Sequence, residues 1–114
     1  MWRTLLLVPL VLAGCSKGPE ADLQYIGQAR SLAAEWALVN EQASEGKLTP
    51  AYVTSMHQWL RDNLQTAQSS LSEPDSPYGH EIAALLTAPD GAPSSELRAH
   101  AARLKQIEDK LESA

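Results

Sequence analysis

The sequence predicts an all-α protein, a small antiparallel three-helix bundle, and three observations support this prediction. Apolar residues recur every three or four positions in three long segments. Gly, Pro, Ser and Thr gather between these segments, as expected for turns and helix caps. The chain contains no Phe and must build its core largely from Leu and Ala, which suits closely packed helices. Its 114 residues are enough for one modest hydrophobic core.

The first two predicted helices form a hairpin. The first follows Asp22 and stops at Gly46, and its apolar stripe has spacings of 4, 3, 4, 3 and 4: Tyr25, Ala29, Leu32, Trp36, Val39 and Ala43. The second starts at Thr49 and Pro50, because Thr caps free amides and Pro is tolerated at the first helical position. It runs to about residue 71, with Val53, Met56, Leu60, Leu64, Ala67 and Leu71 on one face. The short loop between these helices predicts an antiparallel pair.

The remaining chain predicts a short connecting helix and a long C-terminal helix. Ser76 caps the short helix, whose apolar residues are Ile82, Leu85 and Leu86. Residues 87–95 form a loop. The last helix runs from about Ser94 or Ser95 to Glu112, with serine capping its start and Leu97, Ala101, Leu104, Ile107 and Leu111 on its apolar face. That face suits packing within the bundle or, alternatively, a coiled-coil seam with another molecule.

The N-terminal segment has a different pattern. One positive charge in residues 1–3 precedes nine uncharged residues at 5–13. This run is too short to span a membrane, which needs about 20 apolar residues, but it fits the apolar part of a secretory signal. It ends in Leu12, Ala13, Gly14 and Cys15, which resemble the lipobox of bacterial lipoprotein precursors: an apolar residue, two small residues and a cysteine. The resemblance covers about fifteen residues and does not extend to the helical domain.

The resemblance to lipoprotein precursors implies a signal peptide at residues 1–14 and lipidation of Cys15. In that class the thiol carries a diacylglycerol and the new N-terminus is usually acylated, so the membrane anchor is effectively permanent. Ser16 rather than Asp follows the cysteine, which implies the outer membrane where the cell has one. We expect a lipidated tether at 15–22 and a helical bundle domain at 23–114. The alternative is that Cys15 is buried in a core or that this segment is the N-terminal helix of a cytosolic protein.

Charge and cysteine content restrict the partners of the mature chain. Without Arg3, eight basic residues face fourteen acidic ones, a net charge of −6. This sign opposes binding to nucleic acid or to anionic lipid headgroups. A single cysteine cannot form an internal disulfide, so the stability of an exported chain must come from helix packing.

The sequence contains no recognisable catalytic constellation. The segment "HEIAA" begins at His80, but Ala84 stands where the zinc protease motif requires a second histidine. His57, His80 and His100 lie on three predicted helices without nearby carboxylates at metal-site spacing. Met56 and His100 could hold haem in a bundle, but both residue types also fill apolar stripes. We therefore expect no metal, no cofactor and no enzymatic activity.

Two aromatic residues are candidate partner contacts. Tyr52 and Trp59 project from one shoulder of the second predicted helix, and aromatic residues are enriched at binding hot spots. Leu38 lies with Ala34 opposite the main stripe of the first helix. The alternative is that Trp59 packs under the short helix and Leu38 against the last one.

Together these features predict a lipid-anchored protein of the bacterial cell envelope that faces the periplasm. Its expected role is non-enzymatic: structural, accessory or protein-interacting, toward an envelope protein or the cell wall. One alternative is a periplasmic binding module for a small ligand, metal or haem, which would need a closed pocket with convergent polar groups. Another is a small inhibitor or enzyme acting on envelope polymers, which in the case of an enzyme would need paired carboxylates or a perturbed histidine in a cleft.

Overall fold

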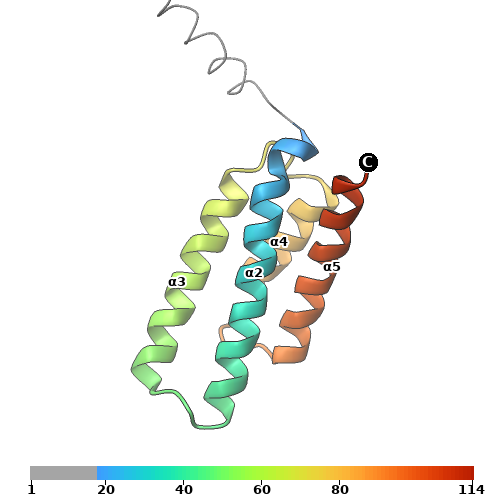
Figure 1. Ribbon diagram of the computed structural model, residues 1–114. Coiled ribbons are helices and arrows are strands. Elements are labelled where there is room, and N and C mark those ends of the chain that lie inside the picture. Colours follow the sequence, from blue (N-terminus) through green and yellow to red (C-terminus); the bar gives the residue numbers. More distant parts are fainter. Residues whose placement is uncertain (1–17) are drawn as a thin grey trace, which may run out of the picture.

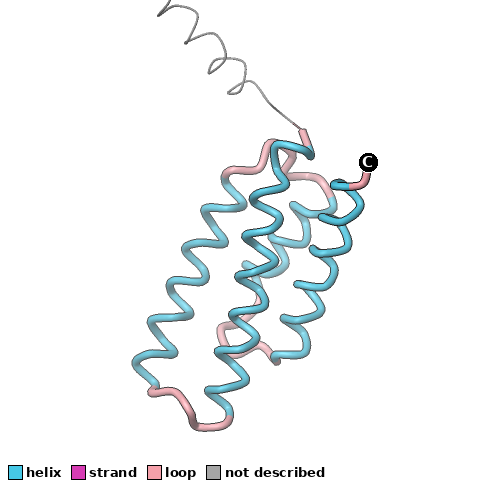
Figure 2. The backbone as a smooth tube through the Cα atoms, viewed as in Figure 1, coloured by secondary structure: helices cyan, strands magenta, loops and turns pink. Residues whose placement is uncertain are grey.

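The computed structural model describes residues 18–114, which form four helices joined by short loops (Figure 1). The helices are α2 (Pro19–Ser44), α3 (Pro50–Ser69), α4 (Pro77–Thr87) and α5 (Ser94–Glu112). Figure 2 shows only helices and loops across these residues. The all-α prediction is therefore confirmed for this part of the chain. The predicted signal peptide and Cys15 lie outside it.

Helix α2 lies between its neighbours and organises the core. Successive helices run antiparallel, and α2 contacts α3 on one side and α5 on the other, whereas α3 and α5 do not contact each other (Figure 1). The short helix α4 contacts all three. Its residues Tyr78, Ile82 and Leu85 are buried, so the predicted connecting helix is a full part of the core.

The hairpin of α2 and α3 extends beyond the other two helices. At 1.5 Å per residue, the 26 residues of α2 span about 39 Å and the 11 residues of α4 about 16 Å. Figure 1 shows the α2–α3 turn projecting past the nearby ends of α4 and α5. No residue from 43 to 56 is buried, and we call this segment the hairpin tip.

Helix α2 begins within the stretch predicted as a tether. Pro19 occupies the first helical position, and Gly18 precedes it with φ 90°, a conformation that glycine adopts without strain. Asp22 is only 1% exposed, so residues 19–22 belong to the bundle and the predicted tether boundary at 22 is wrong. The Gly, Pro and charged residues of this stretch predicted a flexible tether, whereas Pro19 in fact begins a helix. The predicted stop at Gly46 is confirmed, with φ 72°.

Burial on α2 covers more of its surface than one stripe. Ala29, Leu32, Trp36 and Val39 are buried as predicted, whereas Tyr25 and Ala43 are only partly covered. A second set, which the stripe did not include, is also buried: Ile26, Ala33 and Ala37. The reason is the central position of α2, since α5 covers a face that a two-helix hairpin would leave in water. Small alanines there allow the close approach.

Helix α3 is buried in its second half only. Its start is confirmed, because the Thr49 hydroxyl accepts a hydrogen bond from the Tyr52 amide at 3.2 Å. Leu60, Leu64 and Ala67 are buried, but Val53 and Met56 of the same predicted face are only partly covered. Val53 and Met56 lie in the hairpin tip, which α4 does not reach.

The last two helices begin differently. The Ser76 hydroxyl accepts from the Gly79 amide at 3.1 Å, as predicted for a cap. Helix α5 begins at Ser94, but its N-cap is Pro93 and no side chain caps it, so the predicted serine cap is wrong. The Pro93 carbonyl instead accepts from the amide of Leu97. Helix α5 packs on α2 within the chain, burying Leu97, His100 and Leu104.

Candidate interaction surface

Two large aromatic side chains are exposed on α3. Tyr52 is 50% exposed and Trp59 47%, and their separation of seven positions places both on the same side of the helix. The alternative placement of Trp59 beneath the short helix is therefore wrong. Leu38 on α2 is 48% exposed, so its alternative placement against the last helix is wrong as well. Partner contact at Tyr52 and Trp59 stays a prediction.

The two aromatic residues border a hollow between α2 and α3. This hollow has a volume of about 370 Å³ and is lined by Glu35, Tyr52, Ser55, Met56 and Trp59. A second hollow of about 540 Å³ continues along the same two helices toward Gly27 and shares Glu35 and Trp59 with the first. The two form one groove, with Glu35 and Trp59 at the point where they meet. We call it the α2–α3 groove.

A polar network beneath α3 fixes the position of this groove. The Arg61 guanidinium lies 5.1 Å from the Trp36 ring centroid and donates to the Asp90 carboxylate at 2.6 Å. It also donates to the carbonyls of Leu86 and Ala88, which end α4. Arg61 therefore ties α3 to the α4–α5 loop, while Trp59, two residues earlier, points away from that contact.

The same loop is bound from α2. The Trp36 indole N–H donates to the Asp90 carbonyl at 2.9 Å, and the Asn40 amide donates to the carbonyls of Asp90 and Ala92. Because the Asn40 amide nitrogen is used in this way, its oxygen accepts from His57 Nε2 at 2.7 Å. His57 is thus part of the structural network, a role that its position in the sequence did not indicate.

The other two histidines lie elsewhere. His100, 9% exposed, bonds through Nδ1 to the Glu81 carboxylate, which also accepts from Arg103 Nε at 3.0 and 3.1 Å. His100 is therefore a hydrogen-bonded histidine at the edge of the core. His80 is exposed. The predicted separation of the three histidines on different helices is confirmed.

The structure does not bring Met56 and His100 together. Met56 lines the α2–α3 groove, whereas His100 faces Glu81 on α4. Their helices, α3 and α5, make no contact with each other. A haem iron held between these two side chains is therefore inconsistent with the fold.

A buried carboxylate anchors the start of α2. Asp22 accepts from the Tyr78 hydroxyl at 2.7 Å, from the Ser72 amide at 2.8 Å and from the Glu73 amide at 3.2 Å. Burial alone would raise the pKa of Asp22, but these hydrogen bonds outweigh burial and lower its pKa below the ordinary value. Burial and the bond to Asp22 raise the pKa of Tyr78 to about 12, so its hydroxyl remains a donor at neutral pH.

The described part of the chain offers few other chemical sites. Within residues 18–114, no three His, Cys, Asp or Glu side chains gather closely enough to hold a metal ion. No helix in that range is both long and apolar enough to cross a membrane. Comparisons with family models, with curated proteins and with solved structures gave no match to this chain.

Proposed function

We propose that this protein is a lipid-anchored component of the bacterial cell envelope with a non-enzymatic role, presenting a helical bundle to a protein partner. In this proposal α2, α3 and α5 are a three-helix bundle that α4 braces. The observation that carries the interaction role is the exposure of Tyr52 and Trp59 beside a groove that no other part of residues 18–114 covers. Large exposed aromatic side chains next to a concave surface are typical of binding sites.

The anchor rests on the lipobox resemblance at Cys15. The first described residue, Gly18, is held to Ser72 by two hydrogen bonds, at 3.1 and 3.2 Å. It is three positions from Cys15, so the Cα atoms of these two residues are at most about 11 Å apart. The lipid would therefore attach close to the end of the bundle that contains Glu20 and Tyr78. Ser16 after the cysteine favours the outer membrane in a diderm cell.

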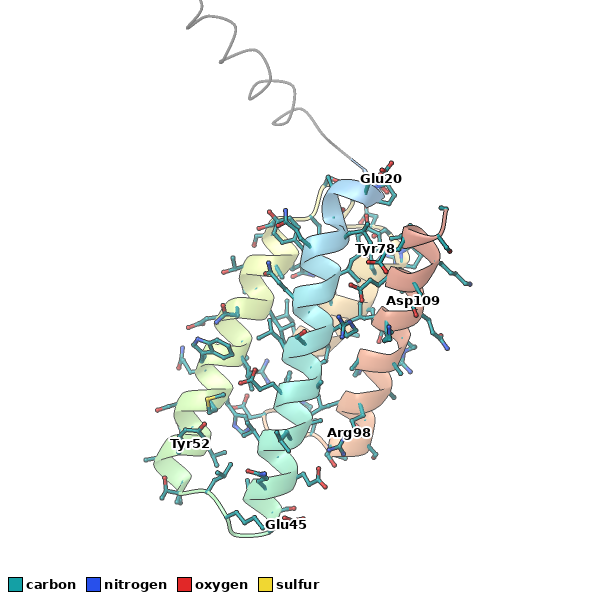
Figure 3. The ribbon with its side chains drawn as sticks, viewed as in Figure 1. Glu20, Glu45, Tyr52, Tyr78, Arg98 and Asp109 are labelled. Carbon is teal, nitrogen blue, oxygen red and sulfur yellow. The ribbon has the colours of Figure 1, made fainter. Side chains whose placement is uncertain are left out.

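This geometry supports a division of roles between the two ends of the bundle. Figure 3 shows Glu20 and Tyr78 near one end, and Tyr52 with Glu45 near the other. The C-terminus lies at the same end as the start of α2 (Figure 1). A lipid at Cys15 would hold the first end at the membrane. The hairpin tip and the α2–α3 groove would then be directed away from the lipid surface, where a periplasmic partner could reach them.

The anchor is tested by Cys15→Ser. We expect the variant to incorporate no labelled fatty acid and to retain its signal peptide, because serine cannot form the thioether. Ser16→Ala is the matched control and should be labelled and processed normally. Lipid incorporation into the Cys15→Ser variant, or its fractionation with membranes at mature size, would contradict the anchor.

The interaction role is tested by photo-crosslinking in intact cells. A photoreactive amino acid at position 52 should yield a discrete higher-mass adduct, because this position lies on the proposed contact surface. The same amino acid at Ala102, which is exposed on α5, is the control and should give no such adduct. Equal adducts from both positions, or none from position 52, would contradict a partner at this surface.

A further inference from the structure

The hollow beside the hairpin tip has an unusual combination of side chains. Tyr52 and Trp59 supply two aromatic rings, Met56 supplies a polarisable thioether between them, and Glu35 supplies a carboxylate from α2. The negative face of an aromatic ring attracts cations, most strongly for Trp, and a nearby carboxylate adds direct charge attraction. Rings and a carboxylate around one hollow therefore favour a positively charged group over an anion or a neutral one.

The charge around the hollow is not neutralised by the protein itself. Glu35 is exposed and forms no ion pair within residues 18–114, and the same is true of Asp62 on the neighbouring α3 surface. The nearest arginine along α2, Arg30, is already paired with Glu108 at 2.7 Å. Glu35 is the only charged residue that lines the hollow beside the hairpin tip, so this hollow presents a negative charge to an incoming partner.

The same chain already holds an arginine with this set of groups. Arg61 lies over the Trp36 ring at 5.1 Å and pairs with the Asp90 carboxylate at 2.6 Å. The Trp59 ring and the Glu35 carboxylate repeat this pairing of indole and acid on the outside of the bundle, with no cation between them in residues 18–114.

We propose that this hollow binds a lysine or arginine side chain of the protein partner. The proposal rests on the proposed function, because it names the chemistry of the partner at the same surface. The cation would approach the faces of Tyr52 and Trp59, and Glu35 would pair with it. The methylene stem would cover Met56, since long basic side chains bury their stems on apolar surface. The volume of about 370 Å³ accommodates such a side chain end.

A second copy of this chain is a poorer occupant. All four arginines within residues 18–114 are in ion pairs: Arg30, Arg61, Arg98 and Arg103. Lys47 and Lys105 are paired as well. Within residues 18–114, a self-complex would have to break one of these pairs or use Lys110 near the C-terminus, and each hollow would face a mature chain of the same negative net charge, −6. Charge complementarity therefore favours a different, basic protein.

The test measures binding of a basic probe to the purified full chain in detergent. The probe is a fluorescein-labelled peptide of alternating arginine and glycine, followed by fluorescence anisotropy, with the glutamine–glycine peptide as the neutral reference. We expect the arginine peptide to bind more tightly and its binding to weaken as salt is added. Equal affinities for both peptides would overturn the cationic specificity but leave a partner at this surface, detected by crosslinking, unaffected.

Three variants test whether the arginine peptide binds at the hollow. Glu35→Gln and Trp59→Leu should each weaken binding of the arginine peptide by about two- to fivefold, the range typical of exposed ion pairs and cation–π contacts. Asp62→Asn removes the same charge from an exposed acid outside the hollow, and it should weaken binding of the arginine peptide by less than about twofold. Circular dichroism verifies that all three variants are folded. Equal losses for Glu35→Gln and Asp62→Asn would show diffuse attraction to an acidic protein and overturn the proposal.

Two further outcomes would identify a different occupant. Concentration-dependent dimerisation that Trp59→Leu abolishes would assign the hollow to a second copy of the chain. Binding to phosphatidylcholine vesicles that depends on Glu35 and Trp59, without binding of the arginine peptide, would assign it to a lipid headgroup. Either result would overturn the proposal of a basic protein partner.

Discussion

Trp36 connects three parts of the molecule through one side chain. Its ring is 1% exposed, it supports the Arg61 guanidinium, and its N–H donates to the Asp90 carbonyl at 2.9 Å. The helical spacing predicted its burial, because it lies in the centre of the α2 stripe. Its polar contacts could not be predicted, since Asp90 is 54 residues away and lies in a loop without periodicity. Residue patterns predict which side chains are buried, but not which distant groups they meet.

Replacing Trp36 should therefore cost more than the loss of an apolar surface. We expect Trp36→Ala to lower the free energy of unfolding by about 3–5 kcal/mol, measured by urea titration, because it leaves a large cavity and removes a hydrogen bond. Trp59→Ala is the matched control, and its half-exposed ring should cost about 1 kcal/mol or less. A loss of less than about 1 kcal/mol for Trp36→Ala would contradict its place in the core.

Asp22 should make stability depend on pH in the acidic range. Its pKa in the folded chain is below the ordinary 3.8, so the unfolded chain binds the proton more readily. Its contribution is therefore fully present above the ordinary pKa and is lost as the pH falls through the lower folded value. We expect Asp22→Asn to destabilise by about 1–3 kcal/mol at neutral pH, since the amide cannot accept all of the bonds.

The contribution of Asp22 is isolated by comparing the free energy of unfolding of the wild type and of Asp22→Asn at several pH values. Urea titrations of the wild type and Asp22→Asn at a series of pH values give the free energy of unfolding of each protein. The difference between the two values should be constant near neutrality and should narrow below pH 3.8. Titration of other acids cancels in this comparison because both proteins share them. A difference that stays constant into acid would show that the Asp22 carboxylate gains nothing from Ser72 and Tyr78.

At the scale of elements, α3 is divided into a buried half and an open half. The sequence presented one apolar face from Val53 to Leu71, and nothing in its periodicity indicated where the cover ends. The limit is set by the length of α4, which only the assembled fold defines. Trp59 points away from the contact between Arg61 and the α4–α5 loop, so its exposure does not depend on the length of α4. The candidate surface could therefore be predicted as residues, but its openness to a partner could not.

The position of α4 depends on a close backbone contact at its start. A Cβ atom on Gly79 would lie 2.1 Å from the Pro74 carbonyl oxygen, a rigid backbone atom. We expect Gly79→Ala to shift α4 and lower the free energy of unfolding by about 1–3 kcal/mol in urea titration. Gly91→Ala, which meets nothing within 4 Å, should change it by less than about 0.5 kcal/mol. Equal stability of the two variants would contradict the tight start of α4.

At the scale of the whole molecule, the helices and most of their caps could be predicted, but their arrangement could not. Amphipathic spacing fixes a helix and its inner face, so the four segments, the stop at Gly46 and the start at Ser76 follow from local chemistry. Which helix takes the centre is decided by long-range packing. The burial of Ile26, Ala33 and Ala37 reflects the central position of α2. Small and apolar residues spread around a helix do not by themselves predict that position.

Helices α4 and α5 cover only part of the hairpin, so its backbone amides should differ in their protection from hydrogen exchange. Amides in the buried half of α3, residues 60–67, should exchange with deuterium at least about tenfold more slowly than amides at 51–56, because the hairpin tip opens without breaking the core. Native-state exchange followed by NMR measures this residue by residue. The equivalent comparison on α2, residues 29–37 against 41–44, is the internal control and should show the same direction. Uniform protection along both helices would mean that another surface covers the tip, which would contradict the open groove on which the proposed interaction depends.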